Sequence, residues 1–147
     1  AWSPWLAKDI SILEDVQIKA IKMISGLNSN DYEGKLKELD LWSLEKRRIM
    51  FDLIQIFKIV KNIGNIKCSI KHVENNIQRG IMTRSQHDET NIMKERAKLD
   101  CRRNFLMNRS ADIWNKLPSE TKHSTTVTKF KRSLVKWMKE NKLTTRD

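Results

Sequence analysis

Residues 43–64 of the chain read SLEKRRIMFDLIQIFKIVKNIG and predict the central helix of the fold. Its apolar residues recur at helical spacing and cover more than half of the circumference of the helix that they predict. Ser43 is a residue type that caps helix starts, and Gly64 is the type that follows helix ends. A helix with so wide an apolar arc is buried on two sides, so other helices must pack against it. The residues of the arc are Ile49, Met50, Leu53, Ile56, Phe57, Val60 and Ile63.

Two helices are predicted before this stretch. Asp9 is expected to cap a helix over residues 9–25, and Asp31 is expected to cap a short helix over residues 31–39. The apolar face predicted for the first of these helices consists of Ile10, Leu13, Val16, Ala20 and Ile24.

Two more helices are predicted after it. One covers Cys101–Leu117 and ends at Pro118, and the other covers residues 126–141 with Thr125 or Thr126 as its cap. Residues 65–95 lack periodicity and predict a long loop. The fold class is therefore all-α, an irregular bundle of about five helices. Its expected parts are a three-helix unit (residues 1–64), an irregular linker (65–95) and a basic two-helix unit (96–147).

Charge and composition indicate which classes of partner this chain can bind. The 147 residues include 29 Lys and Arg against 18 Asp and Glu, a net charge of +11. Residues 76–147 hold 17 of these cations and only 8 acids, which favours a polyanionic partner such as nucleic acid. Two cysteines make no disulfide framework and indicate a reducing compartment. The most apolar stretch, Ile49–Val60, is interrupted by polar residues, so no membrane partner is expected.

Motifs for catalysis and metal binding are missing from the sequence. None of the phosphate-binding patterns G-x-x-x-x-G-K-[ST] and G-x-G-x-x-G, nor the nucleophile pattern G-x-S-x-G, occurs. His72 follows Cys68 at i+4, which is half of a zinc site on a helix, but no second ligand pair accompanies them. We therefore predict no catalytic residue, no metal ligand and no cofactor in this chain.

The last predicted helix carries four cations opposite its apolar stripe, and we call them the basic face. Cations on one side of a helix, without an acid among them, suit contacts with phosphates, although a solvated face is the ordinary alternative. The preceding helix adds three arginines, of which Arg109 lies at the edge of the apolar face and could instead be a buried donor between helices. The candidate nucleic-acid-binding residues are thus Lys129, Arg132, Lys136, Lys139, Arg102, Arg103 and Arg109.

Several short motifs follow one another in an order typical of one family. The first are Trp2-Ser3-Pro4-Trp5, Leu13-Glu14-Asp15-Val16-Gln17 and Ser43-Leu44-Glu45-Lys46-Arg47-Arg48, and the later ones are Asp52-Leu53-Ile54, Phe57-Lys58-Ile59, Trp114-Asn115-Lys116-Leu117-Pro118 and Phe130-Lys131. In order and spacing they resemble the C-terminal region of non-LTR (LINE-type, jockey-like) retrotransposon reverse transcriptases. The resemblance covers nearly the whole chain, and residues 65–95 match it poorly.

The resemblance implies a thumb-like and post-thumb region of an RNA-directed DNA polymerase. In that family an upstream palm holds the Tyr-X-Asp-Asp motif and its magnesium ions, so this chain would be non-catalytic and without a cofactor of its own. Its implied partners are an RNA/DNA duplex, held independently of sequence, and the palm. The implied location is an intracellular ribonucleoprotein in the nucleus or cytoplasm. The chain begins with Ala1 rather than Met, which agrees with a fragment.

Other interpretations stay open at this point. A stand-alone helical module that binds DNA or RNA, such as a helix-turn-helix reader, would have the same charge. An inactive retroelement relic, or a segment that only contacts other parts of the polyprotein, would explain the departures from the family pattern. These departures include Trp5 in place of Tyr, Ile18 in place of a basic residue and Leu106 in place of a second Phe.

Overall fold

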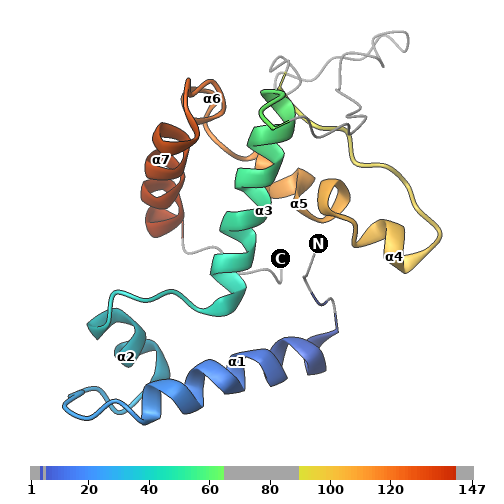
Figure 1. Ribbon diagram of the computed structural model, residues 1–147. Coiled ribbons are helices and arrows are strands. Elements are labelled where there is room, and N and C mark those ends of the chain that lie inside the picture. Colours follow the sequence, from blue (N-terminus) through green and yellow to red (C-terminus); the bar gives the residue numbers. More distant parts are fainter. Residues whose placement is uncertain (1–3, 5, 65–89, 142–147) are drawn as a thin grey trace, which may run out of the picture. The chain divides into compact units, whose positions relative to one another are not determined.

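The structure is a computed structural model that describes residues 4, 6–64 and 90–141 (Figure 1). The regular elements of these residues are helices, which confirms the predicted all-α class. Five of them are seven residues or longer, as predicted. Residues 65–89, which make up most of the predicted loop, lie outside the described residues. The helices are α1 (Ala7–Lys22), α2 (Tyr32–Glu38), α3 (Leu44–Val60), α4 (Asp100–Arg103), α5 (Leu106–Asn115), α6 (Ser119–Lys122) and α7 (Val127–Glu140).

The chain divides into two compact units, Trp2–Ile49 and Met50–Lys142. The division falls inside α3, whereas the sequence patterns place boundaries at residues 64 and 95.

In the first unit, the start of α1 differs from the prediction. The amides of Asp9 and Ile10 both donate to the carbonyl of Leu6, which is therefore the N-cap. The prediction of Asp9 as the cap is wrong, because the helix begins two residues earlier. Asp9 lies in the first turn instead, where a negative charge interacts favourably with the helix dipole.

Glu14 connects the three helix segments of this unit. Its carboxylate accepts a hydrogen bond from the Tyr32 hydroxyl at the start of α2 and another from the Leu44 amide at the start of α3 (3.2 Å). Burial raises the pKa of the Tyr32 phenol above its ordinary value, and the hydrogen bond to Glu14 raises it further. The Gln17 side chain donates to the carbonyl of Trp42 (3.1 Å) and holds the loop before α3.

The predicted caps of α2 and α3 are confirmed. The Asp31 carboxylate accepts from the Gly34 amide (3.0 Å), and the Ser43 hydroxyl accepts from the Lys46 amide (3.3 Å). Each cap satisfies an amide that has no partner within its own helix.

Glu38, at the end of α2, fixes the preceding loop. Its carboxylate accepts from the backbone amides of Asn28 and Ser29, which hold the pKa of the carboxyl below its ordinary value. A lowered pKa means that this contact stabilises the fold above the ordinary glutamate pKa. The stabilisation is lost as the pH falls through the folded-state pKa.

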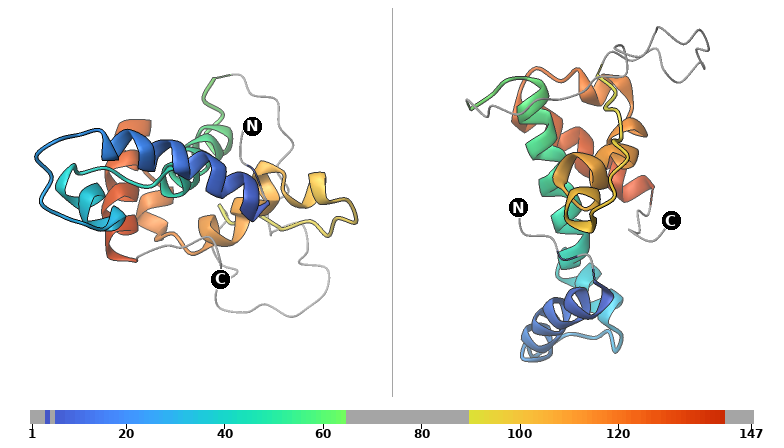
Figure 2. Two further views of the ribbon diagram at one scale, coloured as in Figure 1. Left: turned by 90° about the horizontal axis from the view of Figure 1, so that it is seen from below. Right: turned by 90° about the vertical axis from the view of Figure 1, so that its right-hand side faces the viewer.

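In the second unit, the core forms where α3 meets α7 and α5. The rings of Phe57 and Phe130 stack with centroids 4.2 Å apart, and Trp114 of α5 lies 6.0 Å from Phe130. All three side chains are fully buried. Helices α3, α5 and α7 of this unit therefore pack against one another (Figures 1 and 2). The predicted arc of α3 is buried at Ile49, Met50, Leu53, Ile56 and Phe57, whereas its last member, Ile63, lies beyond the end of the helix and is exposed.

The predicted helix over Cys101–Leu117 is divided in the structure into α4 and α5. The break falls at Phe105, whose backbone is extended (ψ 150°). Asn104 donates to the carbonyl of Asp100 (2.9 Å), and Asn108 donates to the carbonyl of Arg102 (3.0 Å). The Asp100 carbonyl still accepts from the Asn104 amide, so Asn104 adds a bond at the end of α4. Asn108 occupies the Arg102 carbonyl, which a continuous helix would use for the Leu106 amide, and the single-helix prediction is wrong.

Candidate nucleic-acid interface

The helix α7 presents its two faces to different environments. Phe130, Leu134 and Met138 are buried at i, i+4 and i+8 and attach the helix to the core. The hydroxyl of Thr126 accepts from the Lys129 amide (3.2 Å), which confirms Thr126 as one of the two predicted caps. Packing on one side and a cap at the start fix the orientation of the opposite side.

The basic face lies on this opposite side of α7. Its four members, Lys129, Arg132, Lys136 and Lys139, are exposed. Within the described part of the chain, the first three have no hydrogen bond or ion pair from their side chains, and Lys139 takes part in a further contact. Within the described residues, Lys129, Arg132 and Lys136 are therefore available to an external anion.

The first turn of α7 contains no acidic residue, although Lys129 lies in it. A cation at a helix N-terminus opposes the helix dipole and is mildly destabilising. An anion bound at this end of the helix would interact favourably both with Lys129 and with the helix dipole. The first turn thus adds electrostatic support to the exposed row of cations.

Arg102 and Arg103 lie on α4 and are exposed. Arg102 pairs with the carboxylate of Glu95 (3.0 Å), and Arg103 pairs with that of Asp100 (3.1 Å). Exposed ion pairs of this kind contribute between about 0 and 1 kcal/mol, so they exchange readily for a phosphate. Both arginines stay candidates for nucleic-acid contact.

Arg109 is placed differently from the other candidates. Its guanidinium makes a two-pronged ion pair with Asp52 of α3, with both N–O distances at 2.8 Å. It also donates to the carbonyl of Asn104 (2.9 Å), and its side chain is only 20% exposed. The structure therefore gives Arg109 the alternative role, that of a half-buried donor between helices, and it is not part of the exposed surface.

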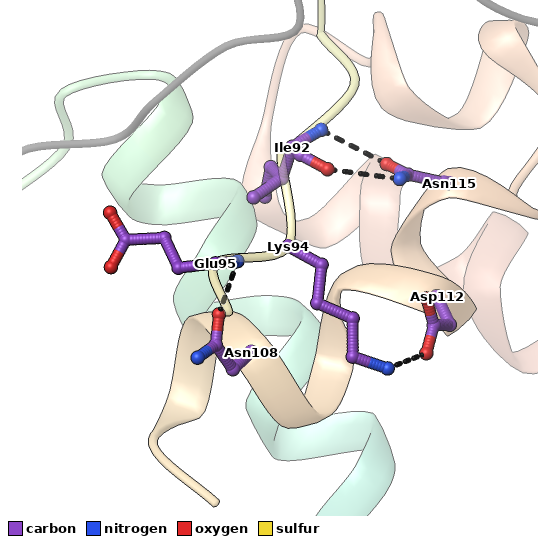
Figure 3. Close-up of polar contacts among 6 residues, drawn as sticks. All are labelled: Ile92, Lys94, Glu95, Asn108, Asp112 and Asn115. Carbon is purple, nitrogen blue, oxygen red and sulfur yellow. Dashed lines mark hydrogen bonds and ion pairs between the residues drawn. The ribbon is translucent and has the colours of Figure 1, made fainter. Parts of the chain in front are cut away.

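A row of polar residues on α5 holds the extended segment of residues 90–95, as Figure 3 shows. The Asn115 side chain accepts from the amide of Ile92 and donates to its carbonyl, both at 3.0 Å. Asn108 accepts from the amide of Glu95 (3.0 Å), and Asp112 pairs with Lys94. Asn108, Asp112 and Asn115 fall on one side of the helix at i, i+4 and i+7. This side of α5 therefore anchors residues 90–95.

Two further contacts complete the attachment of this segment. The indole of Trp114 donates to the carbonyl of Thr90 (2.9 Å), and the ammonium of Lys122 donates to the side chain of Asn91 (2.8 Å). Lys122 is only 2% exposed. Its charge therefore serves the fold, and it is not accessible to an external anion.

The sequence analysis did not predict the contacts that the side chains of Asn108 and Asn115 make with residues 90–95. An asparagine in a helix is a weak signal because its propensity is only mildly unfavourable. It also missed Arg96 and Lys98, which are exposed and follow the extended segment. Their spacing of two residues matches no helical face, so only the extended backbone reveals that they precede α4 at the surface.

Among the described residues, two other kinds of site were considered, a metal site and a membrane-spanning helix. No group of three His, Cys, Asp or Glu residues is placed to hold a metal ion in this part of the chain. None of the described helices is long and apolar enough to span a membrane. Comparison with protein-family models, with curated proteins and with solved structures gives no match.

Proposed function

We propose that this chain is a non-catalytic segment that holds nucleic acid through its phosphates, and that the basic face of α7 makes the contact. The single observation that carries the proposal is the row of exposed cations opposite a fully buried apolar face. Phosphate contacts position a duplex without reading its sequence. The binding is accordingly expected to be independent of base sequence.

The dimensions of α7 suit this role. Lys129 and Lys139 are ten residues apart, which corresponds to about 15 Å along a helix. A duplex carries one negative charge per roughly 1.7 Å of its axis, so a surface of this length can face several phosphates. Because the apolar face anchors α7 to a packed core, the cations are held in a fixed row and lose less entropy on binding.

The resemblance to retrotransposon reverse transcriptases gives this activity a context. We propose that the chain belongs to the thumb-like and post-thumb region of an RNA-directed DNA polymerase, and that it keeps the template–primer duplex in place for a palm elsewhere in the parent protein. Such a task requires cations on rigid helices rather than acids or nucleophiles. Magnesium would serve the palm and not this segment.

The proposal can be tested by reversing one charge on the basic face and one beside it. Lys136→Glu removes a member of the basic face, whereas Lys131→Glu makes the same change in net charge on another side of α7. Both lysines are exposed, so both variants should fold. We expect Lys136→Glu to weaken binding to a DNA duplex and to reduce the slope of log affinity against log salt by about one, with a smaller effect of Lys131→Glu.

Equal effects of the two variants would show that only net charge matters and would contradict the assignment to this face. A preference of the wild type for one base sequence would favour a helix-turn-helix reader instead. No binding to any duplex would favour a segment that serves protein contacts, or an inactive relic.

A further inference from the structure

The connection between α4 and α5 exposes an aromatic ring beside two arginines. Phe105 is 57% exposed and directly follows Asn104 at the end of α4. Arg102 and Arg103 of α4 are exposed as well, and α4 buries none of its four residues. A single exposed apolar residue is ordinary on a protein surface. The inference therefore depends on how this ring is held and on what surrounds it.

Polar side chains hold the backbone on both sides of Phe105. Asn104 donates to the carbonyl of Asp100, Asn108 donates to that of Arg102, and Arg109 donates to that of Asn104, all within 2.9–3.0 Å. Arg109 is itself fixed by its ion pair with Asp52. These hydrogen bonds fix the backbone of the corner between α4 and α5, which we define as residues 102–105. The ring of Phe105 is therefore in place before a ligand binds.

The segment of chain that leads to the ring is mostly positive. Residues 94–105 contain five Lys and Arg against two acids. Arg96 and Lys98 are exposed, and neither has a side-chain partner among the described residues. Arg102 and Arg103 each use one nitrogen for a carboxylate, so most of their five N–H donors face outward. Proteins that bind single-stranded nucleic acid combine exposed aromatic rings with nearby cations, and this stretch of chain supplies both residue types.

We infer that the corner between α4 and α5 binds an unpaired nucleobase of single-stranded RNA or DNA. The base stacks on Phe105, and Arg102 and Arg103 contact the phosphates on either side of it. Every base has a π-face, so the site accepts any base. The inference extends the proposed function, on which it rests, because it adds a site for a single strand to a surface for a duplex.

The test uses the whole chain, a short fluorescent oligothymidine and a blunt DNA duplex. Phe105→Ala removes the ring, Phe105→Trp keeps a stacking face, and Leu99→Ala is the control. Leu99 is 68% exposed and lies just before α4, so its removal takes away apolar surface but no π-face. All three positions are exposed, and circular dichroism verifies that the variants fold.

We expect Phe105→Ala to weaken oligothymidine binding roughly tenfold, with unchanged affinity for the duplex. Phe105→Trp and Leu99→Ala should bind like the wild type. The salt dependence should stay the same in all three, since no charge is lost.

Two results would overturn the inference. One is an affinity for oligothymidine that does not change in Phe105→Ala. The other is an equal loss in Leu99→Ala, which would indicate a general apolar contact, such as one with a protein. Duplex binding that still depends on Lys136 would then leave the proposed function in place. If neither nucleic acid binds at all, the proposed function and this inference both fail.

Discussion

Gly34 shows how the space around one residue can outweigh its helix propensity. Glycine in the first turn of a helix is unfavourable by propensity, and the sequence gives no reason for it. In the structure, a Cβ at this position would lie 2.5 Å from a carboxylate oxygen of Asp31 and 2.8 Å from the Cβ of Ser29. The same carboxylate caps α2 by accepting from the Gly34 amide. The glycine is therefore required for the cap.

This gives a prediction at the residue scale. Propensity alone predicts that Gly34→Ala stabilises the helix by up to about 1 kcal/mol. We expect the opposite, a loss of about 1 kcal/mol, because the methyl group displaces the Asp31 cap. Urea unfolding followed by circular dichroism measures the difference, with Lys37→Ala as the control for an exposed site in the same helix. A more stable Gly34→Ala protein would contradict the steric argument.

At the scale of elements, α5 organises its surroundings through amide side chains. Asn115 satisfies both backbone groups of Ile92, and Ile92 is buried. Leaving a buried amide and carbonyl without partners costs about 1–3 kcal/mol for each group. The attachment of residues 90–95 therefore depends strongly on this one side chain.

We accordingly expect Asn115→Ala to lower the free energy of unfolding by about 2 kcal/mol. We also expect the amide of Ile92 to exchange its hydrogen faster with solvent. Asn141→Ala is the matched control, since its side chain also bonds a backbone carbonyl, that of Trp137 (2.8 Å), but Trp137 is not buried, whereas Ile92 is. Hydrogen exchange and denaturant unfolding measure both effects. If Asn115→Ala and Asn141→Ala lower the free energy of unfolding by the same amount, the anchoring role of α5 is contradicted.

The sequence predicted the helices better than it predicted their faces and breaks. Caps at Asp31, Ser43 and Thr126 follow from local chemistry, and the structure confirms them. The predicted arc of α3 is confirmed only as far as Phe57, because Ile63 lies beyond the end of the helix and is exposed. The predicted apolar face of α1 is wrong at three of its five residues, because Val16 is 64% exposed, Ile24 is 44% exposed and Ala20 is exposed as well. Several faces of α1 carry apolar residues, so periodicity alone does not select the buried one.

The candidate site was predictable to the extent that it depends on one helix. Spacing alone placed the basic face opposite the buried stripe of α7, as the structure has it. Arg109 and Lys122 were harder, because their partners Asp52 and Asn91 are distant in sequence. Which cation is buried depends on tertiary contacts, and a sequence pattern does not report these.

At the scale of the whole molecule, the chain is a strongly basic helical protein whose cations differ in their tasks. Arg109 and Lys122 hold the fold together, whereas the basic face and the corner at Phe105 point outward. The division into two units inside α3 has no marker in the composition, since a continuous helix needs no linker. Net charge alone therefore overstates the charge available to a partner.

The most direct test of the proposed function is the affinity of the chain for a duplex of arbitrary sequence, measured at several salt concentrations. Up to four phosphate contacts from the basic face predict a linear plot of log affinity against log salt with a slope of about −2 to −4. Duplexes of different sequence should give the same line. A slope near zero, or an affinity set by base sequence, would contradict the proposal that this protein holds nucleic acid by its phosphates.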